Sequence, residues 1–205
     1  MSFLPRFMFI VLVLLACQAA SVLNMRERIN QMQILLLDYG ANHITISNRD
    51  VMIVRGAYVS GDAWGGDTYL VLMKQGNKWQ LARPEMGARD NTLIAEVPHT
   101  YEDGVVSIDF LIPKGGNSSK TASDLYLLET ARHYRSSPIE PVPAVFTLYV
   151  LSRENDDLGV LHLRKLQTET STARYCSANL AAYRELGIPL PGAPYPRNEQ
   201  SYACP

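Results

Sequence analysis

Short apolar segments separated by polar turn residues run through most of the chain. In 105–112, every second residue from Val106 to Ile112 is apolar, and Ser107 and Asp109 lie between them. The same period of two recurs at 43–47 and at 160–166. A pleated strand with one buried face produces this alternation. The pattern therefore predicts a β-rich domain.

Two hairpins connect some of these segments. Gly76 and Asn77 form a short turn between 68–75 and 79–84, and the polar run 154–159 joins 144–153 to 160–167. Further strands are expected at 34–38, 51–59, 93–97 and 124–133. We expect a mainly β fold over 34–187, an antiparallel sandwich or folded-over sheet of eight to ten strands with one short C-terminal helix.

The segments that flank this domain differ from it in composition. Residues 22–33 are polar and favour helix, which predicts a tether or a short helix. At the other end, Ser177 can cap a helix over 178–186 that Gly187 and Pro189 terminate. Residues 188–205 contain five prolines and are expected to form an extended tail.

The first 21 residues resemble a bacterial signal peptide. Arg6 precedes an apolar run over 7–15, which is shorter than the roughly 20 residues that span a bilayer. The segment Leu14-Leu15-Ala16-Cys17 resembles a lipobox, in which Cys17 becomes the acylated first residue. In that case Gln18 implies an outer-membrane anchor. Cleavage after Ala19 or Ser21 would give a soluble periplasmic protein, and an uncleaved anchor is a further alternative.

The other two cysteines agree with export. In an oxidising compartment, Cys176 and Cys204 are expected to form one disulfide that attaches the tail to the start of the helix. Closing that loop would stabilise the fold by roughly 3–4 kcal/mol. The alternative is a reactive thiol at Cys176.

The charge balance limits the class of partner. Arg6 is the only charged residue in 1–21, so the remaining chain carries 18 Lys and Arg against 20 Asp and Glu. Near neutrality without a basic run argues against nucleic acid, whose binding depends on neutralising phosphates. The partner is therefore expected to be a small molecule or a protein in the envelope. Membrane contact is expected only through a lipid on Cys17.

Catalytic motifs are missing from the sequence. It contains no Gly-x-Ser-x-Gly elbow, no His-Glu-x-x-His helix and no glycine-rich phosphate loop, and its four histidines are scattered singly. We therefore expect no enzymatic activity, no metal site and no cofactor. The alternative is a hydrolase whose site is assembled from distant residues such as His99 and Asp103.

Two loops are candidate contact sites. The acidic, glycine-rich loop 61–67 carries Asp62, Trp64 and Asp67, and the loop 98–103 carries His99 and Asp103. Loops on a rigid sheet often carry recognition, although both segments are also typical of ordinary strand connections. We expect these five residues to contact a ligand or a partner.

The second half of the chain resembles a known family. The segments that carry the resemblance are Leu127–Arg132, a proline-rich break at 138–143, Phe146–Tyr149, Arg174–Asn179 and Glu185–Gly187. In this order they resemble the CarG-type carbapenem intrinsic-resistance proteins and related exported bacterial proteins. The resemblance implies a periplasmic, β-rich protein that protects its cell. The sequence departs from the family pattern at 38–50 and 60–64.

These observations favour an exported protein that acts by binding or protection, with antibiotic resistance as the role that the resemblance implies. An immunity or assembly lipoprotein that binds a protein partner is the second hypothesis, and a hydrolase is the third.

Overall fold

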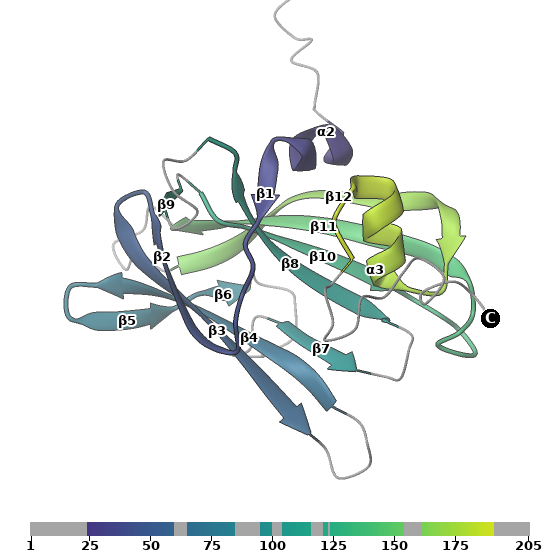
Figure 1. Ribbon diagram of the computed structural model, residues 1–205, viewed down its shortest axis with the longest axis horizontal. Coiled ribbons are helices and arrows are strands. Elements are labelled where there is room, and N and C mark those ends of the chain that lie inside the picture. Colours follow the sequence, from purple (N-terminus) through teal and green to yellow (C-terminus); the bar gives the residue numbers. More distant parts are fainter. Residues whose placement is uncertain are drawn as a thin grey trace, which may run out of the picture.

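The computed structural model describes residues 24–59, 65–84, 95–99, 104–115, 121–122, 124–153 and 161–190. These ranges form two β-sheets and a helical layer (Figure 1). In sheet A, neighbouring strands follow the order β1 (Met32–Ile34), β8 (Val106–Pro113), β10 (Tyr126–Arg132), β11 (Val142–Arg153), β12 (Leu161–Tyr175) and β6 (Arg83–Pro84).

Sheet B lies against one face of sheet A. Its order is β5 (Lys78–Leu81), β4 (Gly65–Gln75), β3 (Arg49–Val59), β2 (Gly40–Ile46) and β9 (Thr121–Ala122), and β7 (Ala95–His99) also pairs with β4. Among the strand pairs that the structure describes, only β6–β12 and β2–β9 are parallel. Apart from the two-residue strands β6 and β9, the described residues form ten strands. The predicted mainly antiparallel β fold is confirmed.

Two short helical segments cover the other face of sheet A. Helix α2 (Met25–Asn30) begins with a capping box, in which the backbone N–H of Glu27 donates to Asn24 and the Glu27 carboxylate accepts from the Asn24 N–H. Helix α3 (Ala178–Ala181) begins at Ser177, as predicted, and continues as the π-helical turn η1 (Ala182–Leu186). Gly187 ends the turn at φ +75°, a conformation that glycine adopts without strain.

Two hydrophobic cores hold the three layers together. The core between the sheets contains Ile53, Val71, Phe110 and Leu127. The core between sheet A and the helices contains Met25, Leu111, Leu128 and Leu180. Phe110 and Leu111 are adjacent on β8 and point into different cores, as the alternation of a strand requires.

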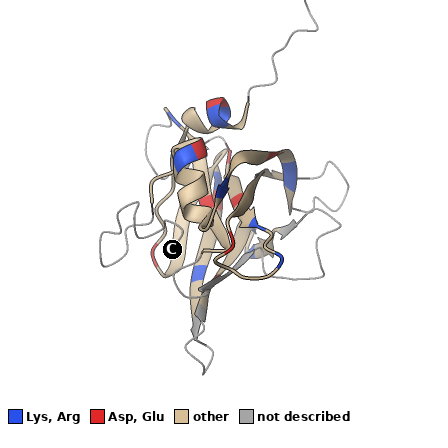
Figure 2. Cartoon of the chain, turned by 90° about the vertical axis from the view of Figure 1, so that its right-hand side faces the viewer, with Lys and Arg blue, Asp and Glu red and all other residues tan. Residues whose placement is uncertain are grey.

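Figure 2 shows the side of the molecule that lies at the right in Figure 1, where Lys and Arg are interspersed with Asp and Glu.

Three predicted elements differ from the structure. The predicted strand 34–38 is wrong, because β1 ends at Ile34 and residues 35–39, here called the strap, cross from sheet A to sheet B. Leu35 and Leu37 pack against the core between the sheets while Leu36 is 90% exposed, so the strap alternates without pairing as a strand. The predicted strand 79–84 divides into β5 and β6, and β12 continues to Tyr175 instead of ending at 167.

Within the described part of the chain, no helix has the length and apolar character needed to cross a membrane. The proposed signal segment 1–21 lies outside the described residues, as does the tail after Leu190.

Candidate functional site

Charged and phenolic side chains gather on the inner face of sheet B. Arg55 on β3 lies opposite Tyr69 on β4, and Asp67 lies two residues before Tyr69 on the same face. Because strand residues two apart share a face, all three point toward sheet A. Asp67 is 4% exposed, and the Arg55 side chain is 27% exposed.

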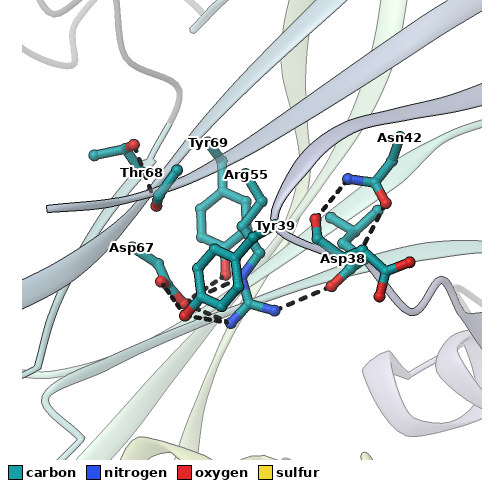
Figure 3. A network of polar contacts seen from close by, with 9 residues as sticks. Asp38, Tyr39, Asn42, Arg55, Asp67, Thr68 and Tyr69 are labelled. Carbon is teal, nitrogen blue, oxygen red and sulfur yellow. Dashed lines mark hydrogen bonds and ion pairs between the residues drawn. The ribbon is translucent and has the colours of Figure 1, made fainter.

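The Asp67 carboxylate is the centre of this network (Figure 3). Its Oδ2 lies 2.7 Å from Nη2 of Arg55 and also accepts from the Tyr69 hydroxyl at 3.4 Å. Its Oδ1 accepts from the Tyr39 hydroxyl at 3.0 Å. Charge-assisted hydrogen bonds of this kind are the stronger ones in proteins. Asp67 therefore joins β3, β4 and the strap.

Arg55 attaches the strap in two further ways. Its Nη1 donates to the carbonyl oxygen of Leu37 at 3.1 Å, and its guanidinium carbon lies 4.3 Å from the centre of the Tyr39 ring. The second contact is a cation–π interaction, which orients the ring as well as attracting it. Tyr39 remains 59% exposed. The strap thus presents an aromatic ring whose position is fixed from the protein side.

The turn that follows the strap is fixed by Asn42. Its Oδ1 accepts from the Asp38 N–H at 2.9 Å, and its Nδ2 donates to the Asp38 carbonyl at 2.8 Å and to the Gly40 carbonyl at 3.2 Å. Gly40 has φ +100°, which a residue with a Cβ rarely adopts. These contacts determine where the strap enters β2.

The environment keeps both phenols protonated. Burial, together with the nearby charge of Asp67 and despite that of Arg55, raises the pKa of Tyr69 to about 12. Burial and the hydrogen bond to Asp67 also raise the pKa of Tyr39. Burial alone would lower the pKa of Arg55, but the hydrogen bond to Asp67 and nearby charges raise it. At neutral pH the network therefore consists of neutral phenols and a guanidinium cation.

The structure pairs the described ends of the two predicted contact loops. Gly65, where β4 begins, pairs with His99, where β7 ends, and Asp67 pairs with Val97. The described ends of segments 61–67 and 98–103 are therefore adjacent in sheet B. Asp67 lies in the network described above, and only the backbone of His99 is described. Asp62, Trp64 and Asp103 lie outside the described residues.

Of the three cysteines, the structure describes Cys176 alone. Cys176 is 1% exposed and directly precedes Ser177, the cap of α3. Cys17 and Cys204 lie in undescribed segments, so the lipid anchor and the Cys176–Cys204 disulfide stay predictions.

Sequence reasoning missed Tyr39, Arg55 and Tyr69. Arg55 is a cation inside the apolar strand segment 51–59, and this is the one local signal that could have indicated a buried ion pair. Among the described residues, no three His, Cys, Asp or Glu side chains are grouped so as to hold a metal ion.

Comparison with known proteins shows similarity at the level of the fold. No protein-family model and no curated protein sequence matches the chain. The crystal structure of CarG matches with a TM-score of 0.57 at 13% identity, over 74% of this chain and 94% of that chain. At that identity the match shows the fold alone. The chain therefore has a CarG-like β-sandwich fold.

Proposed function

We propose that the chain is an exported envelope protein that acts by binding or protection rather than by catalysis. The fixed, exposed ring of Tyr39 at the end of sheet B carries this proposal. A contact group that is already ordered loses less conformational entropy when a ligand binds. The ring, with the adjoining ends of β4 and β7, forms the proposed contact surface.

A carbapenem is the first ligand class to test. The sequence resembles the CarG-type carbapenem intrinsic-resistance proteins in 124–187, and the CarG-like fold supports that resemblance. In this proposal, Tyr39 and the loop residues Trp64 and His99 contact the ligand. Asp67 acts through Tyr39 and Arg55, because its carboxylate accepts hydrogen bonds from both.

Isothermal titration of the purified exported protein with a carbapenem and with soluble cell-wall fragments tests the proposal. We expect one of the two to bind, and Tyr39→Ala to weaken binding about tenfold or more, because the ring is the main exposed contact. Tyr134→Ala is the matched control, since Tyr134 is 40% exposed on the separate loop 133–141. Flat titrations with both probes, from protein that is folded, would count against a small-molecule ligand.

Export is part of the same proposal. Mass spectrometry of the protein recovered from its own cells reports the first residue, any lipid on Cys17 and the oxidation state of Cys176 and Cys204. An intact leader with reduced cysteines contradicts the envelope location. Acylated Cys17 together with a stoichiometric protein partner would favour the immunity or assembly hypothesis.

A further inference from the structure

A second surface lies on the helix side of sheet A, separate from the Tyr39 network. A hollow of about 270 Å³ opens between α2, β1 and the residues that follow η1. Its lining is mostly apolar and includes Ile29, Met32, Ile34, Leu111, Leu186 and Ile188. Its volume lies just below the roughly 300–1,000 Å³ of typical ligand pockets, and an apolar lining with few polar groups is typical of them.

The strap follows directly after Ile34, which lines the hollow. Ile34 packs against the helix-side core, whereas Leu35 and Leu37 pack against the core between the sheets. Because the side chains alternate here, Leu36 lies on the same side as Ile34. Leu36 is 90% exposed, the largest exposure among the large hydrophobic residues that the structure describes. A ligand that extends along the strap would cover the exposed side chain of Leu36.

The opposite end of the hollow is cationic. Lys114 belongs to the lining, and its Nζ donates to the carbonyl oxygen of Asn30 at 2.9 Å, a bond that holds the ammonium at the rim. The side chain is exposed, so two of its three N–H donors can bind a ligand. Asp109 lies in the other direction along β8, two residues before Leu111 and on the same face. Lys114 therefore supplies one positive charge at the α2 rim of the hollow.

We propose that this groove binds the acyl chain of an anionic amphiphile, with the carboxylate or phosphate of its head group at Lys114. The apolar lining takes the chain, and Leu36 contacts its distal part. Apolar area removed from water supplies most of the affinity, while the ammonium selects the sign of the head group. This site is independent of the function proposed for the Tyr39 surface.

Titration calorimetry below the micelle concentration tests the proposal, with dodecanoate, octanoate and dodecyltrimethylammonium as probes for the purified protein. We expect dodecanoate to bind at least about tenfold more tightly than octanoate, because four more methylene groups leave water. Dodecanoate is also expected to bind more tightly than the cationic amphiphile of equal length. Tyr134→Ala, on the separate loop 133–141, is expected to leave all three affinities unchanged.

Variants separate this site from non-specific adsorption. Lys114→Glu is expected to reverse the preference between dodecanoate and dodecyltrimethylammonium, and Lys114→Arg to retain it. Leu36→Asp is expected to weaken dodecanoate binding about tenfold, whereas Ile139→Asp, at a residue 49% exposed on another loop, leaves it unchanged.

Three results would overturn the proposal. They are a flat dodecanoate titration with folded protein, equal binding of the anionic and cationic amphiphiles, and equal losses in Leu36→Asp and Ile139→Asp. Self-association that Leu36→Asp abolishes, without any amphiphile binding, would instead make this surface an interface between two copies.

Discussion

Asp67 and Arg55 form an ion pair with 2.7 Å between Oδ2 and Nη2, and this pair also positions Tyr39 through contacts with each partner. Asp67 binds the hydroxyl of Tyr39, and Arg55 lies against its ring. Loss of either partner therefore affects both the stability of the sandwich and the position of its exposed aromatic residue.

Asp67→Asn is expected to lower the free energy of unfolding by about 2 kcal/mol, because it leaves a partly buried guanidinium without its carboxylate. Urea denaturation measures this change. Asp50→Asn is the matched control, since the Asp50–Lys74 pair is 3.4 Å long and about half exposed, and should contribute less than about 0.5 kcal/mol. Equal effects in the two variants would mean that the Asp67–Arg55 pair is no stronger than a surface pair.

A second prediction concerns pH. The Asp109 side chain on β8 is half-buried, and burial raises the pKa of its carboxyl to about 7. A carboxyl with a higher pKa in the folded state binds its proton more tightly when folded. The stabilisation that the protonated Asp109 carboxyl contributes is therefore present at acidic pH. It declines as the pH rises from about 4 to 7 and is lost above that range.

Asp109→Asn replaces this group with a neutral side chain of the same shape. The variant should match the natural protein near pH 4 and exceed its free energy of unfolding progressively up to about pH 7, by at most about 4 kcal/mol. Urea denaturation of both proteins between pH 4 and 8 measures the difference. Parallel curves would show that Asp109 titrates normally in the folded protein.

The β fold could be predicted from the sequence because the two faces of a strand differ in composition, which leaves a period of two in the chain. In β8, Ile108, Phe110 and Ile112 face sheet B, whereas Ser107 and Asp109 lie on the helix side with Leu111. The strap has a similar alternation, but no pattern of side chains indicates that its backbone leaves β8 after Leu35, whose N–H donates to the Phe110 carbonyl. Pairing depends on the neighbouring strand, so the strand at 34–38 was predicted wrongly.

The candidate site could be predicted only in part, because its contacts depend on how separate strands are placed. Its contacts join residues distant in the sequence, with Arg55 separated by 12 positions from Asp67 and by 16 from Tyr39. No local motif contains such a group. The loops at 61–67 and 98–103 could be proposed from composition, but only the strand pairing of Gly65 with His99 shows that their described ends are adjacent.

A third prediction concerns the cysteines. If Cys176 and Cys204 are joined, reduction of the exported protein should lower its free energy of unfolding by about 3 kcal/mol, because the unfolded chain loses a closed loop. Denaturation with and without a reducing agent measures this effect. Cys176→Ala should be less stable and insensitive to reduction, and equal sensitivity in both proteins would place the reducible bond elsewhere.

The last prediction uses two buried hydroxyls in sheet A. Thr130 is 0% exposed, and its Oγ1 has no hydrogen-bond partner within the described part of the chain. Ser171 is also buried, but its Oγ accepts from the Ala144 N–H at 2.9 Å and donates to the Ala173 carbonyl at 2.7 Å. A buried polar group costs free energy unless it is hydrogen-bonded.

Thr130→Val keeps the shape of the side chain and removes the unpaired hydroxyl, so it should raise the free energy of unfolding by about 1 kcal/mol. Ser171→Ala should lower it by about 1–2 kcal/mol, because the Ala144 N–H loses its acceptor. Urea denaturation of the two variants at one pH measures both changes. A loss in Thr130→Val as large as that in Ser171→Ala would show that a bound water satisfies Thr130, since only a bonded hydroxyl is costly to remove.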